Sequence, residues 1–401
     1  MIDYITPDST IAKTDDQSIS LAINKAKETG VNKVIIPKYN QRTGQNLWII
    51  ENCIRLPDGI EIIIDGAHLC LADGVYCNMF CNENLGTDKG RTPQGKQKNI
   101  TIRGRGAATL DGGKYNGLSE RNSEKDNLPH ISVNTTLFFA NVTGLTVENL
   151  NIINQRWWGI TNVFVSNAVF RNIRFKADIS RIDADGIHHP DELPQNYEEI
   201  YVKNADGIDL RVGCHDILIE NITGFTEDDT VALTALGTFE SRLGYAVDGG
   251  DFDIHDVKIR HVASDPFCCS VVRLLNDNGF KLYNIDIDGV THLHLTDSDM
   301  QTHAAVKIGD MAYAKKHSEL GDTHHISVRN VVSSAKYAVA LCKGLSDSVI
   351  ENIFVAPGGI YGVGASENNF AELERCRIEN ISAYSDSVGL MPADRLTVVR
   401  Q

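Results

Sequence analysis

Acidic side chains recur in the middle of the chain at a spacing that would let them meet in a folded protein. The stretch Asn204-Ala-Asp206-Gly-Ile-Asp209 is followed by Glu227-Asp228-Asp229, so that Asp206 and Asp228 are 22 positions apart, and Asp183 lies 23 positions before Asp206. Clustered carboxylates raise one another's pKa. A protonated carboxyl beside an ionised one is what general acid–base catalysis requires. The alternative interpretation is that these aspartates only bond local backbone at corners of the chain.

A spacing near 23 is meaningful because a short phrase repeats along the chain with the same period. The phrase alternates apolar and variable residues and ends on Asn or a substitute. Its last positions are Asn149, Asn172, Asn221, His261, Asn284, Asn330, Asn352 and Asn380. The gaps between them are 23, 49, 40, 23, 46, 22 and 28, and most are one or two multiples of about 23. A fixed period of this size predicts a solenoid, which stacks equivalent residues of neighbouring turns.

The alternation within each phrase is a strand signal. Leucine-rich repeats need a regular leucine ladder, which the chain lacks, and the longer helical repeats do not fit the period. We therefore predict an all-β fold, a right-handed parallel β-helix, with the strands of a β-sandwich as the alternative. The repeated Asn tolerates a left-handed backbone at a corner and can form an amide ladder. Neighbouring strands lie about 4.8 Å apart, so Asp183, Asp206 and Asp228 are expected on one face.

The predicted domain organisation is one β-helix over residues 1–401, with a cap region at 1–35 and turns over about 36–395. Asp15 and Asp16 precede apolar residues at helical spacing, and Gly30 ends that run, which predicts a short capping helix. A cap is needed because an open strand edge invites aggregation. Polar excursions from the turns are predicted at Gly86–Lys98, Asn116–Asn127, Pro190–Glu198 and Met311–Asp322.

The composition of the chain argues against some classes of binding partner. The net charge of −15 argues against nucleic acid and anionic membranes as partners. No run of 18 apolar residues or secretion signal is visible, and the nine cysteines form no metal-type CxxC pair. We expect a cytoplasmic protein, although a trimmed secreted chain would look the same. Flanks of β-helices often pack into oligomers, so a homo-oligomer is possible.

The acidic stretches resemble those of a known family. Asn204-Ala-Asp206-Gly-Ile-Asp209 is similar to the NTDGID motif of the polygalacturonases (glycoside hydrolase family 28), and Glu227-Asp228-Asp229-Thr-Val-Ala-Leu is similar to their second Asp-Asp motif. Upstream, Asp15-Asp16-Gln-Ser-Ile and Ala108-Thr-Leu-Asp111-Gly-Gly also resemble stretches of that family. The resemblance covers most of the chain.

The resemblance implies a glycoside hydrolase acting on a pectin-type or related oligosaccharide, without a cofactor or metal. Asp228 would be the general acid that protonates the leaving oxygen, and Asp206 and Asp229 would hold and deprotonate the water. The outcome would be inversion, which needs carboxyl groups about 6.5–9.5 Å apart.

The chain departs from the family pattern at two motifs. The family's Gly-His-Gly motif is missing after Leu233, and its Arg-Ile-Lys motif reads Arg273-Leu274-Leu275. Arg273 remains a candidate to grip a substrate oxygen. The missing lysine weakens the case for a uronate and leaves room for a neutral sugar, unless Lys307 replaces it from a later turn.

Three further residues are candidate sugar contacts. Asp183-Ala-Asp185-Gly-Ile-His188 nearly repeats the later acidic phrase, so Asp185 and His188 are placed at the substrate, with His188 a possible replacement for the missing imidazole. A structural role and a metal site remain open for His188. Trp158 follows Trp157, and either could stack on a sugar ring. Neighbouring strand residues face opposite ways, so at most one of the two points into the groove, and core packing is the alternative.

Two other functions stay open on the same scaffold, because a fold does not fix a reaction. One is a polysaccharide lyase or a fructan-processing enzyme; a lyase would produce a new double bond or need calcium. The other is a non-catalytic carbohydrate-binding spike, which would bind glycan without turnover.

Overall fold

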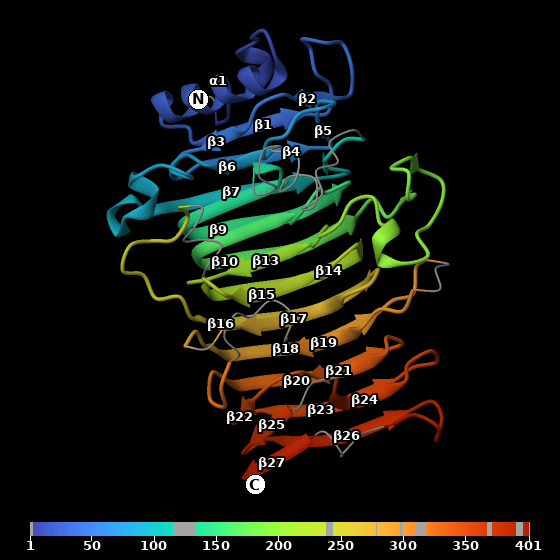
Figure 1. Cartoon of the computed structure of the whole chain (residues 1–401). Helices are drawn as coiled ribbons and strands as arrows, with labels where there is room; N and C mark the ends of the chain where they lie inside the picture. Colours follow the sequence, from blue (N-terminus) through green and yellow to red (C-terminus); the bar gives the residue numbers. More distant parts are fainter. Residues whose placement is uncertain are drawn as a thin grey trace.

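The strands stack one above another into a long coil, the predicted right-handed parallel β-helix (Figure 1). The computed structural model describes residues 3–114, 133–237, 244–277, 279–296, 300–309, 318–366 and 371–389, and the backbone of 396–400. Within these residues, every pairing between strands of the main sheet is parallel. The predicted excursion Asn116–Asn127 and most of Met311–Asp322 lie outside the described residues.

The strands form vertical columns along the coil. One column leads through the acidic region and comprises β3 (Ile54–Leu56), β6 (Phe80–Asn82), β13 (Ile208–Arg211), β15 (Val231–Ala235), β17 (Ser270–Asn276), β19 (Ala304–Ile308), β21 (Tyr337–Leu341) and β24 (Tyr361–Ala365). The long strands β9 (Leu137–Ile153) and β10 (Ile160–Lys176) run from this column into the next one.

The second column forms the long face of the solenoid. It comprises β1 (Lys33–Pro37), β4 (Glu61–Asp65), β7 (Gln97–Arg105), β14 (His215–Thr226), β16 (Ile254–Pro266), β18 (Leu282–His292), β20 (Thr323–Ser333), β22 (Leu345–Ser346), β23 (Val349–Val355), β25 (Ala371–Glu374), β26 (Arg377–Ala383) and β27 (Leu396–Arg400). A short third column near the N-terminus holds β2 (Trp48–Ile50), β5 (His68–Leu71) and β8 (Thr109–Asp111).

The core is a stack of apolar side chains from equivalent positions. Ile217 pairs with Val257, Val257 with Ile285, and Ile285 with Ile326, and all four side chains are buried. Burial of apolar area stabilises by about 25 cal/mol per Å². Each turn therefore contributes to one continuous core, and a neighbouring turn is needed to cover it.

The repeated Asn positions are corners with a left-handed backbone, as predicted. All eight last positions of the phrase have φ between 53° and 61°. An amide ladder joins several of them: Asn172 donates to Asn149 (2.8 Å), Asn221 to Asn172 (3.1 Å) and Asn380 to Asn352 (3.2 Å).

Asn284 is the one of these eight last positions that lies at a different corner of its turn. Arg260 is in register with Asp288, so His261 lies level with Gly289 on the next turn. Gly289 also has a left-handed backbone, with φ 78°. Asn284 instead lies at the level of Asp256 and donates to its carboxylate (3.2 Å). The assignment of Asn284 to the ladder was therefore wrong, because each turn has two left-handed corners five residues apart and the sequence pattern does not separate them.

The capping helix is confirmed. Helix α1 (Asp15–Thr29) covers the N-terminal end of the coil and buries Ile19, Ala22, Ile23 and Ala26 (Figure 1). Thr14 is the N-cap, and Gly30 ends the helix with φ 71°. Asp15 lies in the first turn and anchors the helix to the coil, since it accepts hydrogen bonds from Asn40, Arg42 and the backbone of Ile49.

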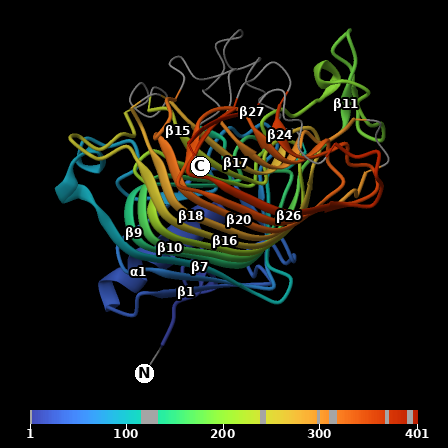
Figure 2. The same ribbon diagram turned by 90° about the horizontal axis from the view of Figure 1, so that it is seen from below.

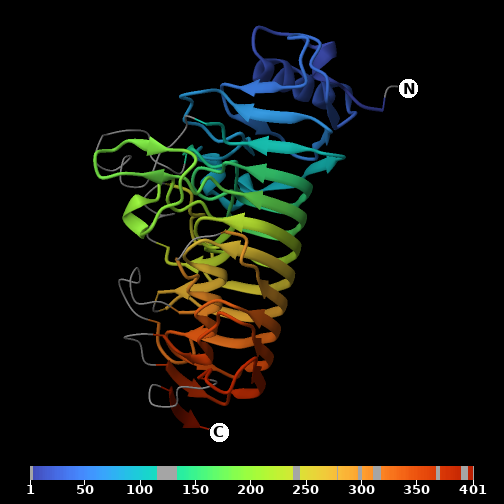
Figure 3. The ribbon, with the colours of Figure 1, turned by 90° about the vertical axis from the view of Figure 1, so that its right-hand side faces the viewer.

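The excursion predicted at Pro190–Glu198 is longer than expected. Residues 177–204 leave the coil after β10, form the antiparallel pair β11 (Arg181–Ile182) and β12 (His188–His189), and return through a 3-10 turn at Tyr197–Glu199. Figures 2 and 3 show this segment projecting from the side of the solenoid away from the long strands. Short 3-10 turns at Lys89–Arg91 and Pro93–Gly95 occupy the predicted loop Gly86–Lys98. None of the described helices is long and apolar enough to span a membrane.

Candidate active site

The acidic segment Glu227–Asp229 lies in a widening of one turn, directly before β15. The backbone N–H of Glu227 donates to Ala205 O, and the backbone N–H of Gly207 donates to Asp229 O (2.9 Å). In a parallel ladder these bonds put Ala205 level with Thr226 and Gly207 level with Thr230, so one turn advances two residues while the turn above it advances four. Such a bulge re-aims side chains locally, and here it places Asp228 and Asp229 over Asp206.

Buried hydroxyl groups brace the widened turn. Thr226 Oγ1 donates to Asp228 O (2.7 Å) and lies 3.0 Å from Thr230 Oγ1, which in turn contacts Ser264 Oγ at 2.7 Å. The backbone N–H of Asp229 donates to Asp228 Oδ1 (2.9 Å). These contacts fix the direction of both carboxylates before any ligand arrives.

Five carboxyl groups are buried together around the bulge. Their residues are Asp206, Asp209, Glu227, Asp228 and Asp229, and none is more than 8% exposed. The predicted meeting of Asp206, Asp228 and Asp229 on one face thus occurs. Asp209 and Glu227, which sequence reasoning quoted only as parts of motifs, belong to the same cluster. Their signal was the acidic phrase itself, since each stands one to three residues from a candidate acid.

Burial controls the protonation of this cluster. Desolvation, followed by repulsion from Asp209, raises the pKa of Asp206 well above its usual value. Desolvation likewise raises the pKa of Asp209, and it raises the pKa of Glu227 to about 8. Asp206 Oδ1 and both Asp209 carboxylate oxygens accept no hydrogen bond from donors in the described part of the chain. Both shifts favour the protonated forms of Asp206 and Asp209.

Asp229 forms an ion pair with Arg273. Arg273 Nη1 lies 3.2 Å from Asp229 Oδ2, and the backbone N–H of Ser270 donates to Asp229 Oδ1 (2.9 Å). Desolvation raises the pKa of Asp229 to about 6, while Arg273 and Lys307 oppose that rise. Asp229 therefore ionises more readily at neutral pH than Glu227, whose pKa is about 8.

Arg273 and Lys307 occupy one column of outward-facing positions. Asp209 pairs with Ala232, Ala232 with Arg273, and Arg273 with Lys307 on successive strands. Lys307 thus reaches the acidic cluster from the next turn. Leu275, which stands where the resemblance expects a lysine, is buried at 2% exposure.

Trp158 lies at the edge of the cluster and is 8% exposed. Its ring stacks on Trp157 with centroids 4.2 Å apart, and Arg211 lies over the Trp158 ring at 4.5 Å. The expectation that the two tryptophans face opposite ways does not hold, because both precede β10 and lie outside a strand.

The excursion 177–204 carries the other predicted contacts. Asp183, expected one turn below Asp206, instead lies on the β11–β12 hairpin and contacts His189 Nε2 at 2.8 Å. The 23-residue spacing failed here because the excursion replaces a solenoid turn. Asp185 is exposed on the same hairpin, and His188 contacts Ser180 Oγ at 2.7 Å and stacks on Tyr201 at 3.8 Å.

The sequence analysis did not single out His303, whose backbone adjoins Cys269. The backbone N–H of His303 donates to Cys269 O (3.0 Å), and Cys269 Sγ lies within 4.8 Å of carboxylate oxygens of Asp228 and Asp229. His303 therefore stands one turn beyond the acidic bulge. No motif marks it in the sequence, because its approach depends on the stacking of β17 and β19.

Asp228, Asp229 and Cys269 are close enough to share a metal ion. Their other contacts do not suit one. Asp229 already binds Arg273 and the Ser270 amide, and a hydrogen bond with Cys268 together with burial holds the pKa of the Cys269 thiol well above its usual value. The Arg273 guanidinium already supplies a positive charge to Asp229, so this carboxylate has a cation partner within the chain.

Similar solved structures are right-handed β-helix proteins. A tailspike protein of E. coli bacteriophage HK620, in complex with pentasaccharide, has a TM-score of 0.64 at 12% identity, over 96% of this chain and 67% of that one. An exopolygalacturonase from Thermotoga maritima has a TM-score of 0.56 at 15% identity, over 95% and 91%. A polygalacturonase from Erwinia carotovora has a TM-score of 0.57 at 14% identity, over 97% and 94%. No family model and no curated protein sequence matches the chain. At these identities the likeness establishes the fold.

Proposed function

We propose that the protein is a glycoside hydrolase of the polygalacturonase-like type, which cleaves an oligosaccharide by an inverting acid–base mechanism at the Asp206–Asp229 cluster. The observation that carries the proposal is the bulge that stacks Asp228 and Asp229 over Asp206. Five buried carboxyls cost stability unless a reaction uses them. The similarity to two polygalacturonases and a pentasaccharide-bound tailspike supports a glycan as the ligand.

Asp229 is the better of the two candidate bases. A base must be ionised to deprotonate water, and Arg273 and Lys307 favour the ionised form of Asp229. Asp206 retains its proton because burial and its carboxyl neighbours raise its pKa. In this proposal Asp228 protonates the leaving oxygen, Asp229 activates the water, and Asp206 orients that water.

The carboxyl groups of Asp228 and Asp229 are closer together than those of a typical inverting pair. Carboxylate oxygens of the two residues lie within 4.8 Å of each other, which is shorter than the separation of about 6.5–9.5 Å typical of inverting pairs. The water would therefore sit to one side of the pair, toward Asp206, and the configuration of the product tests whether this spacing supports inversion.

The decisive variant is Asp228→Asn, because it keeps the shape and the Asp229 N–H acceptor while removing the proton donor. We expect turnover of natural oligosaccharides to fall by about 10³-fold or more. An aryl glycoside with an acidic leaving group needs no proton, so the same variant should retain much of its activity on that substrate.

Product analysis by NMR on the wild-type protein gives the anomeric configuration. Turnover of oligosaccharides by Asp228→Asn at the wild-type rate would refute the assignment. Retention of configuration would refute the inverting mechanism, and glycan binding without any turnover would favour the carbohydrate-binding spike.

A further inference from the structure

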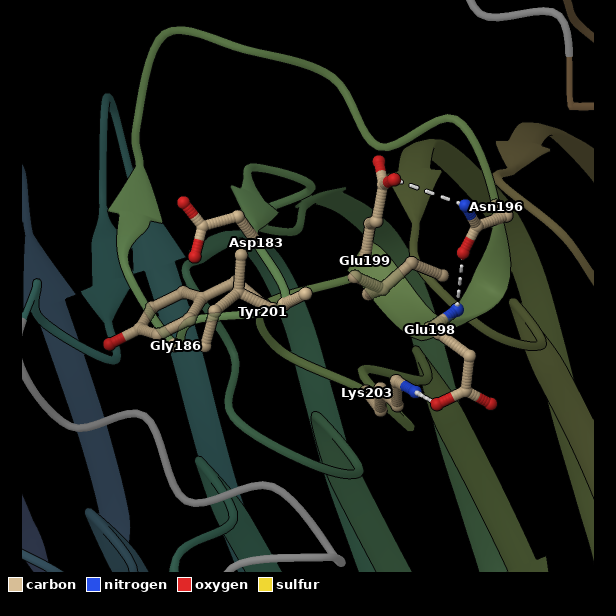
Figure 4. Close-up of a pocket in the computed structure, with 10 residues that line it drawn as sticks. Asp183, Gly186, Asn196, Glu198, Glu199, Tyr201 and Lys203 are labelled. Atoms are coloured by element: carbon tan, nitrogen blue, oxygen red, sulfur yellow. Dashed lines mark hydrogen bonds and ion pairs between the residues drawn. The ribbon is translucent and has the colours of Figure 1, made fainter.

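A cavity opens in the excursion that leads into the acidic bulge. Its volume is about 610 Å³, within the range of small-molecule sites. The lining residues are Ile182, Asp183, Ala184, Gly186, Asn196, Glu198, Glu199, Ile200, Tyr201 and Lys203. Figure 4 shows Asp183 and Tyr201 facing Glu199, Asn196 and Lys203 across this space. The three candidate catalytic aspartates are not part of its wall.

The cavity nevertheless adjoins the candidate active site. Lys203, in its wall, is three residues before Asp206, and its charge lowers the pKa of Glu227 in the acidic cluster. Ile200 packs in one apolar cluster with Ala205 and Phe267, next to the acidic turn and to Cys268. A chain of sugar units that crosses the bulge would therefore continue into this cavity.

The polar wall groups are held in place by the excursion itself. Asp183 Oδ1 accepts from the backbone N–H groups of Asp185 and Ile187, and its Oδ2 contacts His189 at 2.8 Å. Glu199 accepts from Gln195 N and Asn196 Nδ2. An ionised carboxylate has about four acceptor positions, so each of these groups can still accept a hydroxyl proton from a ligand.

The charge of the wall is negative. Asp183, Glu198 and Glu199 contribute three carboxylates, and Lys203 contributes one cation, 3.6 Å from Glu198. Hydrogen bonds from His189 and the Ile187 amide keep the pKa of Asp183 low, so this carboxylate is ionised. A uronate carboxylate in this cavity would meet net repulsion. A neutral sugar would offer hydroxyl donors to the carboxylates and carbon faces to Ile182 and Ile200.

We infer that this cavity is a sugar-binding subsite selective for a neutral sugar unit over a uronate. The inference rests on the proposed function for the direction of the glycan chain, and it deepens that function by naming the class of sugar. The walls supply three carboxylate acceptors against the single cation of Lys203.

Binding to the full chain carrying Asp228→Asn tests the inference without turnover. The probes are fluorescently labelled tetrasaccharides of galacturonate and of neutral galactose, rhamnose and xylose units. At least one neutral probe is expected to bind at least about 10-fold more tightly than the galacturonate probe, a difference typical of charged hydrogen bonds. Tighter binding of the galacturonate probe, or no binding of any neutral probe, would overturn the inference.

Glu198→Lys, added to Asp228→Asn, reverses one wall charge at an exposed side chain and should leave the fold intact. We expect the preference for the neutral probe to fall by at least about 10-fold, through a gain in galacturonate binding. Glu28→Lys, the same change on α1 at the N-terminal end, is the matched control and should leave the preference unchanged. An unaltered preference in the Glu198 variant would place the sugar elsewhere.

The two proposals fail separately. Turnover of any glycan by the wild-type protein supports the hydrolase, whatever the cavity variants do. Selective binding that Glu198→Lys alters supports the subsite, even where the wild-type protein turns over none of the probes.

Discussion

Two columns of stacked polar side chains run along this solenoid, and they are built on opposite principles. The amide ladder at Asn149, Asn172 and Asn221 lies exposed at a corner, and each amide satisfies the next. The acidic column at Asp206, Asp228 and Asp229 is buried, and its members repel one another.

The difference separates a structural use of stacking from a functional one. An amide offers both donors and acceptors, so identical residues one turn apart stabilise each other. Carboxylates offer only acceptors when ionised, so the same stacking costs free energy unless protons, cations or a ligand intervene. The amide ladder stabilises the fold, and this is sufficient reason for its presence. The acidic column destabilises the fold, so its presence needs a functional reason.

Among the changes that test this comparison, the largest effect is expected from removing the cation that pairs with Asp229. Arg273→Met should reduce turnover at pH 7 by about 100-fold, because loss of the ion pair raises the pKa of Asp229 above about 6 and keeps the base protonated. The rising limb of the pH–rate profile should move to higher pH. Arg273→Lys should restore part of that limb, since it returns the charge without the guanidinium. A limb that stays in place in both variants would remove Arg273 from this role.

The acidic column should also lower the stability of the folded protein as pH rises. A carboxyl whose pKa is raised by folding favours the folded state less once pH exceeds its ordinary value of 3.8. Asp209→Asn should therefore stabilise the protein by about 1–3 kcal/mol at pH 8 and by much less at pH 4. Its amide can also donate to Asp206 Oδ1. Thermal unfolding across this range measures the effect, and exposed Asp73→Asn is the control. An equal gain at both pH values would contradict the burial argument.

The amide ladder should respond in the opposite direction. Asn172→Ala removes hydrogen bonds to Asn149 and Asn221 and places a Cβ-bearing residue without a compensating side chain at φ 55°. A loss of about 1–2 kcal/mol is expected, with little dependence on pH. Asn172→Gly separates the two causes, because Gly tolerates the left-handed backbone and loses only the amide bonds. Equal stability of the Ala variant and the wild type would show that the ladder contributes nothing.

The smallest effect is expected where the ladder is interrupted. His261 stands at the level of Asn221 with φ 53°, since Glu220 is in register with Arg260. His261→Asn should add one exposed amide hydrogen bond to Asn221 and stabilise the protein by about 0.5 kcal/mol. Chemical denaturation compared with His261→Gly, which keeps the backbone but adds no amide, isolates that bond. A variant no more stable than His261→Gly would mean that the rung does not form.

Much of the fold and part of the site followed from the residue pattern. The phrase ending at Asn172 predicted both a strand and a left-handed corner, because one residue type fits that local backbone. The misplacement of Asn284 arose because two corners in each turn accept the same residue types. Asp183 was assigned to the wrong turn because it belongs to an excursion from the coil. Its 23-residue spacing from Asp206 equals one turn only by coincidence.

The sequence by itself determined the repeating turn, the capping helix and the spacing of Asp206 and Asp228 by about one turn, because these depend on local preference and on a period. Only the tertiary structure decided the bulge at Glu227–Asp229, the approach of Lys307 and His303, and the cavity beside Lys203. Those features depend on how many residues each turn inserts between fixed strands. Hydrogen bonding between neighbouring turns settles that number, and no single segment of the chain encodes it.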